Sequence, residues 1–159
     1  MTGLKCETLW DHFKITLQKD PEHEFLGTRN HTKTAEPYEW LKFRDVAESI
    51  KEFSHVVRKL DLCREIEILD SGIDQKMWRT MGFYSENRAE YVIAMLACMS
   101  DSITVIPVNA KPTDVSMAQL IMEHSMLEVL CVSKITLTQV LLRRTHRRRT
   151  FELNSGLPK

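Results

Sequence analysis

The sequence predicts an α/β fold in which part of a doubly wound parallel sheet follows an N-terminal extension of strands and helices. The main indication is the segment Met81–Val108, whose pattern is that of a strand, a polar turn, an amphipathic helix and a second strand. A strand, a crossover helix and a further strand within so few residues are typical of a right-handed parallel unit. Further helices and strands are predicted before and after this unit.

The extension occupies roughly the first 60 residues. A weak helical pattern in residues 9–17 precedes an acidic turn, and residues 38–43 alternate aromatic or apolar with charged side chains. That alternation is the period of a strand with one buried face. From Arg44 the period becomes helical, with apolar residues at steps of three and four: Val46, Ile50, Phe53, Val57 and Leu60. We expect this stripe to pack in the core rather than to bind a partner.

The turn and helix of the central unit have their own signals. Residues 61–80 before them are polar and irregular, and we expect Trp78 to anchor this loop. Ser85 or Asn87 is a predicted cap for the helix, because either side chain can accept hydrogen bonds from its first free N–H groups. The helix itself carries an apolar stripe on one face: Tyr91, Val92, Met95, Leu96 and Met99.

Two further strands and two helices are predicted after this helix. Residues 103–106 are β-branched, and we expect this strand to stop at Pro107, which cannot donate to a central sheet ladder. Residues 115–125 favour a helix capped by Thr113 or Asp114, and residues 127–132 favour a third strand. A last helix is predicted over 136–146.

Composition excludes several classes of protein. The chain has 159 residues, of which 43% are hydrophobic and 28% charged, enough for one domain with a core. No apolar run approaches the length of a membrane span, and the N-terminus lacks the apolar core of a secretory signal. The cysteines are widely spaced without a CxxC pair, which disfavours a metal site and favours free thiols in a reducing, cytoplasmic location: Cys6, Cys63, Cys98 and Cys131.

Several segments together resemble the N-terminal region of long-chain acyl-CoA synthetases, which belong to the AMP-binding, adenylate-forming ligases. The resemblance begins at Phe25–Arg29 and Tyr38–Trp40 and is most specific at Gly82–Tyr91, where the family has a strand entering an Asn-Arg-x-Glu-aromatic turn. It continues through Val105–Val108 to Glu123–Ser125. The family uses ATP, magnesium and coenzyme A to convert fatty acids to thioesters, and its full-length members are often associated with membranes.

The sequence also departs from that family. None of its five glycines lies in a cluster like the Ser-, Thr- and Gly-rich phosphate-binding loop. Ser155–Lys159 resembles only the end of that loop, and we interpret it as a chance similarity. The adenine-binding segment, the ribose-binding Asp and the domain with the catalytic Lys have no counterpart, and Val108–Lys111 differs from the usual Leu-Tyr-Asp-Thr. We therefore predict no catalytic, cofactor-binding or metal-binding residues in this chain, and we expect no cofactor to bind to it.

The remaining polar features have ordinary structural interpretations. Ser85–Arg88 follows a parallel strand, a position that often binds ligands, but Asn87 and Arg88 are expected mainly to fix the turn and pair with local carboxylates. The six histidines do not form a cluster in the sequence, and although His12 has an acidic neighbour, Asp11, a role as ligand or base is not expected.

Charge divides the chain into two parts. Residues 1–134, the predicted partial ligase domain, hold 16 Lys and Arg against 21 Asp and Glu, whereas residues 135–159 hold 6 against 1. This basic tail contains Arg143, Arg144, Arg147, Arg148 and Arg149. We predict a truncated long-chain fatty acid–CoA ligase that is itself inactive, with a tail that arose from a truncated or mis-spliced gene. The alternative is a non-catalytic binding module whose tail contacts nucleic acid or acidic lipid.

Overall fold

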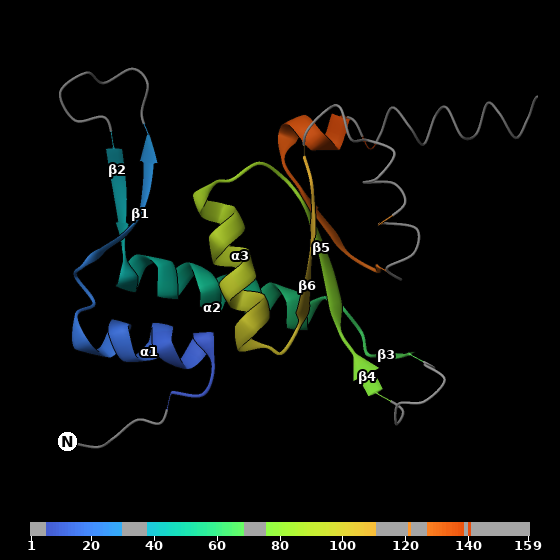
Figure 1. The fold of residues 1–159 in the computed structure, drawn as a ribbon, viewed down its shortest axis with the longest axis horizontal. Helices are drawn as coiled ribbons and strands as arrows, with labels where there is room; N and C mark the ends of the chain where they lie inside the picture. The colour runs from blue at the N-terminus through green and yellow to red at the C-terminus, as the bar shows by residue number, and fades with distance from the viewer. Residues whose placement is uncertain are drawn as a thin grey trace, which may run out of the picture.

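The computed structural model describes residues 6–29, 38–68, 76–110, 121, 127–138 and 140. Its elements, in chain order, are α1 (Leu9–Lys19), β1 (Glu24–Arg29), β2 (Tyr38–Lys42), α2 (Phe43–Lys59), β3 (Ile66–Ile68), β4 (Lys76–Trp78), β5 (Thr80–Tyr84), α3 (Ala89–Ser100), β6 (Thr104–Val108) and β7 (Leu130–Val132). The helices and the β1–β2 pair form one half of the molecule, and the strands β3–β7 form the other (Figure 1).

A parallel sheet organises the second half, and it confirms the predicted α/β fold. Its strand order is β6–β5–β7, with both neighbours parallel to β5. All five residues of β5 are buried, as expected for the apolar central strand of a covered sheet. The α3 helix connects β5 to β6, so the predicted strand–helix–strand unit is present. The predicted third strand is present as β7, although it is limited to three residues.

The predicted end of β6 at Pro107 is wrong. Pro107 lies within β6 and is paired with Phe83. Because β6 has a described neighbour only on the β5 side, a proline whose missing N–H faces away from β5 breaks no hydrogen bond of the ladder.

The helix predicted from Arg44 is confirmed as α2. Val46, Ile50 and Val57 are buried, and the first two of these pack with Phe13 of α1 and Leu96 of α3 in one core cluster. Leu60, in contrast, is 62% exposed. It is the C-cap residue of α2, so the helical spacing that directs the earlier apolar residues inward no longer holds there.

The two antiparallel strand pairs differ from the prediction. Residues 38–42 form a strand, β2, paired with β1, but Tyr38 and Trp40 are about half exposed rather than buried. The β1–β2 pair projects from the helices, and no described layer covers its outer part (Figure 1). The region predicted as irregular contains the pair β3–β4, in which Trp78 is paired with Ile66 and is partly exposed. Most of the loop that Trp78 is predicted to anchor lies outside the described residues.

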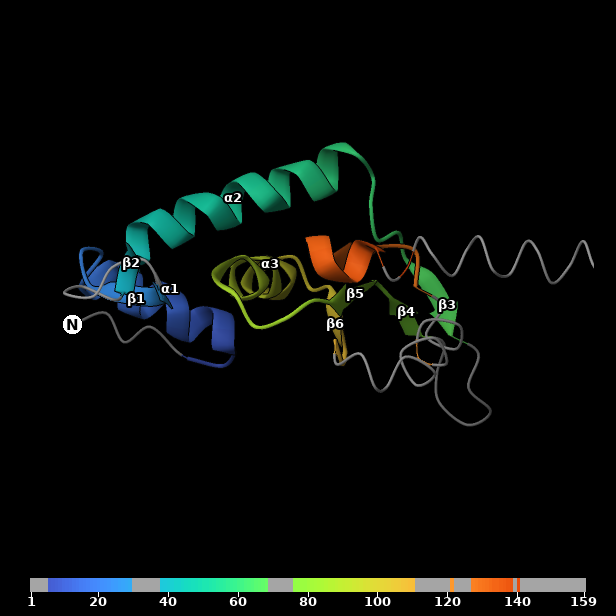
Figure 2. The ribbon, with the colours of Figure 1, turned by 90° about the horizontal axis from the view of Figure 1, so that it is seen from above.

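The α3 helix lies at the junction of the two halves. One side contacts α1 and α2, and another contacts the sheet. Its buried residues are Ala94, Leu96, Ala97 and Cys98. Of the predicted stripe, Leu96 is buried, and Tyr91, Val92 and Met99 pack against the core clusters from its edge. Tyr91, Val92, Met95 and Met99 are only half-buried. No described helix or strand covers the side of α3 opposite α2 (Figures 1 and 2).

Three sulfur atoms meet in the core between α3 and the sheet. The thiols of Cys98 and Cys131 lie 3.6 and 3.5 Å from the thioether sulfur of Met81. Burial raises the pKa of Cys98 to about 12 and that of Cys63 to about 11. These cysteines are free, as predicted; Cys63 and Cys98 are buried, whereas Cys131 is only partly buried.

Candidate functional site

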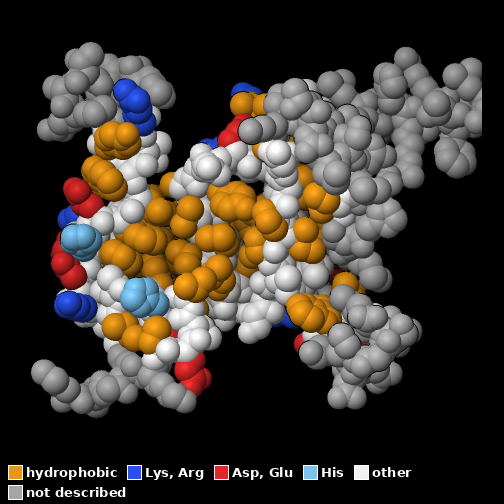
Figure 3. All heavy atoms as spheres, viewed as in Figure 1, with side chains coloured by type: hydrophobic (Ala, Val, Ile, Leu, Met, Phe, Trp, Pro, Cys, Tyr) orange, Lys and Arg blue, Asp and Glu red, His pale blue; other side chains and the backbone are white. Residues whose placement is uncertain are grey.

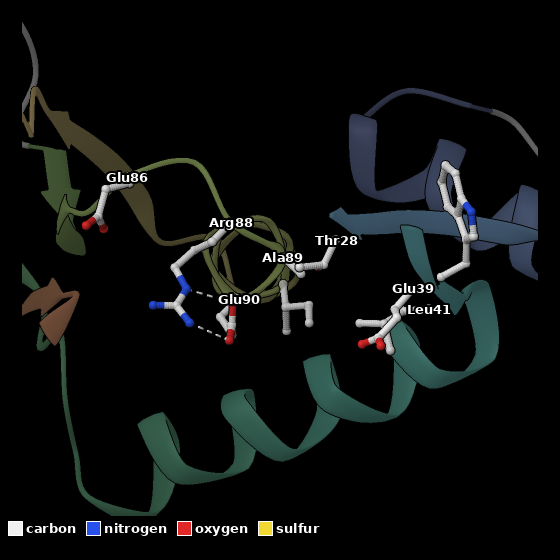
Figure 4. Close-up of a pocket in the computed structure, with 9 residues that line it drawn as sticks. Thr28, Glu39, Leu41, Glu86, Arg88, Ala89 and Glu90 are labelled. Atoms are coloured by element: carbon white, nitrogen blue, oxygen red, sulfur yellow. Dashed lines mark hydrogen bonds and ion pairs between the residues drawn. The ribbon is translucent and has the colours of Figure 1, made fainter. Parts of the chain in front are cut away.

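A cleft of about 470 Å³ lies between the β1–β2 pair and the start of α3 (Figure 4). We call it the α3–β2 cleft. Its lining residues are Thr28, Glu39, Trp40, Leu41, Glu86, Arg88, Ala89, Glu90 and Ile93. The residues contributed by β1 and β2 were not predicted for any site. The only sequence signal for them was the alternation in residues 38–43, which indicates a two-faced strand without saying what covers each face.

The polar turn that leads into α3 is held by a local ion pair. Arg88 is the N-cap residue, and no side chain caps the helix, so the predicted capping by Ser85 or Asn87 is wrong. Both Nε and Nη2 of Arg88 donate to the Glu90 carboxylate, each at 2.8 Å (Figure 4). This confirms that Arg88 pairs with a local carboxylate. The two-point contact occupies one edge of the guanidinium, which is the edge that would otherwise grip a phosphate.

A second, smaller cleft of about 290 Å³ lies at the carboxyl ends of β5 and β7. It shares Arg88 and Glu90 with the α3–β2 cleft and is otherwise lined mainly by side chains of β5, α3 and β7. Its lining residues are Phe53, Phe83, Ser85, Arg88, Glu90, Tyr91, Ala94, Cys131, Val132 and Ser133. The position is the one at which parallel sheets commonly bind ligands.

Ser133, which lines this second cleft, belongs to a hydrogen-bonded turn at residues 133–136. The backbone N–H of Ser133 donates to Oγ1 of Thr136 at 2.9 Å, and the N–H of Thr136 donates to Oγ of Ser133 at 3.3 Å. Oγ1 of Thr136 also donates to the carbonyl oxygen of Tyr84. The S-x-x-T spacing of a reciprocal helix cap is the sequence signal that could have indicated this connection.

The charged groups of these clefts favour binding over proton transfer. A hydrogen bond from Ser133 lowers the pKa of Glu86, and a hydrogen bond from Arg88 lowers that of Glu90. Both carboxylates are therefore ionised near neutral pH, which makes them poor general acids. Burial raises the pKa of the Cys131 thiol, which disfavours its use as a nucleophile.

A nucleoside triphosphate or its magnesium ion does not suit the described cleft residues. Glu86 and Glu90 would repel phosphate, and Arg88 is engaged by Glu90. Across the described residues, no group of three or more His, Cys, Asp or Glu side chains is placed to hold a metal ion.

Other predicted features have mixed outcomes. The Asp11 carboxylate is bonded to Thr8 and Lys14, rather than to its neighbour His12. Residues 134–138 and 140 are helical. The other residues of the predicted helix over 136–146, most of the one over 115–125, the five tail arginines and Ser155–Lys159 lie outside the described residues. The predicted contact of the tail with an anionic partner stays a prediction. No described helix is long and apolar enough to cross a membrane.

Comparison with known proteins identifies sequences and folds that resemble this chain. No family model matches the chain. It is 26% identical over 133 residues to long chain acyl-CoA synthetase 2 of Arabidopsis thaliana, covering 83% of this chain and 18% of the relative. It is 30% identical over 100 residues to long-chain-fatty-acid–CoA ligase 1 of Cavia porcellus, covering 63% and 12%.

The fold has solved counterparts. The fatty acyl-adenylate ligase of Legionella pneumophila, in complex with acyl adenylate and pyrophosphate, matches with a TM-score of 0.65 at 12% identity, covering 85% of this chain and 21% of that chain. The chain thus spans less than a fifth of the length of the two curated relatives. The Legionella ligase and this chain share the arrangement of helices and strands around the parallel sheet.

Proposed function

We propose that this chain, a sequence relative of the long-chain acyl-CoA synthetases, is a structural part of a long-chain fatty acid–CoA ligase. The observation that carries the proposal is the similarity to a curated synthetase over 133 residues, 83% of the chain. A similarity confined to one short motif would allow many functions, whereas this one extends across both halves of the fold.

The reaction proposed for the whole ligase has two steps. A fatty acid carboxylate attacks ATP to give an acyl-adenylate and pyrophosphate, and the thiol of coenzyme A then displaces AMP to give the thioester. The Legionella neighbour supports an acyl-adenylate intermediate, because that ligase was solved in complex with acyl adenylate and pyrophosphate. ATP, magnesium and coenzyme A are the proposed cofactors and substrates of the ligase.

In this proposal the 159 residues alone do not catalyse either step. Adenylation needs positive groups arranged around the developing charge on the phosphates, and the sequence has no glycine-rich phosphate-binding loop. The role proposed for residues 1–134 is to form the β5–α3–β6 unit and its helical cover. The divergent residues 135–159 are proposed to lie outside the ligase domain.

The test combines mass and activity of the endogenous protein. Antibodies raised against residues 38–68 are used to isolate it, and fatty-acid-dependent exchange of pyrophosphate into ATP is measured, with omission of fatty acid as the control. We expect exchange from a protein much heavier than 18.6 kDa, and none from the recombinant 159-residue chain. A heavier endogenous protein without exchange would refute the ligase proposal. Exchange by the recombinant chain would refute its inactivity.

A further inference from the structure

Three sulfur-bearing side chains from three different elements meet on one face of the parallel sheet. Met81 and Phe83 lie two residues apart on β5 and therefore point to the same face, and both pack with residues of α3 in one core cluster. Cys131 of β7 is paired with Phe83 and packs against the same cluster, which also contains Cys98 of α3. The thiols of Cys98 and Cys131 lie 3.6 and 3.5 Å from the Met81 thioether. We call Met81, Cys98 and Cys131 the sulfur cluster.

The sulfur cluster adjoins the second cleft. Cys131 lines that cleft of about 290 Å³ together with Phe83 and Ala94. Cys131 is only partly buried, whereas Met81 and Cys98 are 1% and 0% exposed. A small ion that enters the cleft therefore meets the Cys131 thiol first and finds the Met81 sulfur 3.5 Å from it.

Two thiols and a thioether are a soft set of ligands, and such ligands select copper(I) in proteins. Bonds of about 2.3 Å between a metal and sulfur place three sulfurs of a trigonal site roughly 4 Å apart. The separations of 3.5 and 3.6 Å would need to widen by less than about half an ångström to reach that geometry. Zinc suits the cluster poorly, because structural zinc sites use four ligands and no group of three or more His, Cys, Asp or Glu is placed to hold a metal among the described residues.

We propose that the sulfur cluster is a copper(I) site reached through the second cleft. The ion binds without a change of oxidation state: a copper–sulfur bond replaces the S–H bond of one thiol, and the proton leaves to solvent. A monovalent ion with a single thiolate leaves the cluster uncharged overall, which a buried position tolerates. Burial raises the pKa of Cys98 to about 12 and also raises that of Cys131, so both thiols hold their protons until the ion displaces one.

This inference is independent of the ligase proposal. It depends only on the packing of α3 against β5 and β7, and a failure of the ligase activity would leave it unchanged. The spacing of the cysteines in the sequence did not predict the site, because its three ligands come from separate elements and one of them is a methionine.

The test measures copper binding to the 159-residue chain, kept reduced and free of oxygen. All samples carry Cys6→Ser, because Cys6 is an exposed thiol that would bind copper adventitiously. Copper(I) is added as its acetonitrile complex in competition with bicinchoninate, and X-ray absorption at the copper edge counts the sulfur neighbours. We expect a single ion per folded chain, a shell of three sulfurs, release of about one proton, and no retention of zinc added at the same concentration.

Substitutions at the ligands identify the site. Met81→Leu nearly keeps the side-chain volume but removes the thioether, so it should leave two sulfur neighbours. It should also weaken copper binding at least about tenfold, since the loss of even an outer-shell partner costs that much, and Cys131→Ser should do the same. The matched control is Cys63→Ala, because Cys63 is 1% exposed in the same core cluster but is not a member of the sulfur cluster, and its binding should be unchanged. Circular dichroism checks that each variant is folded, and Cys131→Ser, at the partly exposed position, decides the test if Met81→Leu is not folded.

Several results would overturn the inference. These are no retained copper, fewer than three sulfur neighbours in the chain with Met81 intact, equal retention of zinc, or equal copper affinity in urea, where any thiol could bind the ion. Equal weakening by Cys63→Ala and by the ligand substitutions would likewise show that the copper is not held by the sulfur cluster.

Discussion

Asp11, in the first turn of α1, makes the stability of the folded chain depend on pH. A hydrogen bond from Lys14, and then one from Thr8, lowers the pKa of Asp11 from its ordinary value of 3.8 to about 2. Because the folded-state pKa is depressed, the carboxylate stabilises the folded chain above pH 3.8, and this stabilisation is lost as the pH falls from 3.8 through about 2.

The corresponding experiment is urea unfolding followed by circular dichroism at pH 7, 4 and 2. We expect part of the loss of stability on acidification to disappear in Asp11→Asn, which cannot ionise. Thr8→Ala, which removes the N-cap oxygen, should lower stability by about 1 kcal/mol at pH 7. An unchanged acid profile in Asp11→Asn would show that Asp11 is not responsible.

The thiols provide a second prediction at the scale of single residues. Cys6 is exposed, whereas Cys63 and Cys98 are buried with pKa values raised to about 11 and 12. Since the thiolate is the reactive form, iodoacetamide at pH 8 should modify Cys6 first in the folded chain and all four cysteines in urea. Mass spectrometry of the peptides measures this, and Cys6→Ser should remove the fast reaction. Equally fast modification of Cys98 would contradict the described core.

At the scale of elements, the α2 helix has one face buried in the core and one face exposed to solvent. Ile50 is 2% exposed and packs in the cluster with α1 and α3, whereas Val56 in the same helix is 48% exposed. Ile50→Ala should therefore lower the free energy of unfolding by about 3 kcal/mol through lost contacts and a cavity. Val56→Ala should change it by less than about 0.5 kcal/mol. Urea titration of both variants measures the difference, and equal effects would contradict the orientation of α2.

The sequence predicts well those elements whose spacing of apolar residues fits a single periodicity within the element itself. The α2 spacing and the apolar β5 segment identify their elements because each pattern matches one periodicity. Burial was predicted less well: Trp40 and Met95 are apolar at regular positions but have no described layer above them. Periodicity shows which residues share a face, and only the tertiary arrangement shows whether that face is covered. The α3–β2 cleft was missed for the same reason, because its two sides are distant in sequence.

At the scale of the whole molecule, the uncovered surface predicts how the isolated chain behaves. The half-buried Met95 on α3 and the partly exposed Trp40 and Leu41 should bind the dye anilinonaphthalene sulfonate. The unpaired outer sides of β6 and β7 among the described strands should promote association. Met95→Lys should reduce dye fluorescence and concentration-dependent association, whereas Val56→Lys should leave the dye signal nearly unchanged. Fluorescence and light scattering measure the two effects. No difference between the variants would show that Met95 is not part of the dye-binding surface. The hydrophobic side chains on this face of the molecule are seen in Figure 3.

The contacts around β5 also have a consequence for the order in which the chain folds on the ribosome. Arg79 reaches the carbonyl oxygen of Asp101 over 22 residues, whereas Thr136 reaches that of Tyr84 over 52. The shorter loop costs less entropy to close, and its residues are also synthesised first. The β5–α3–β6 unit can therefore form while β7 is still inside the exit tunnel. During that interval the β7 side of the central strand is open, and a chaperone that recognises extended apolar segments would have its binding site there.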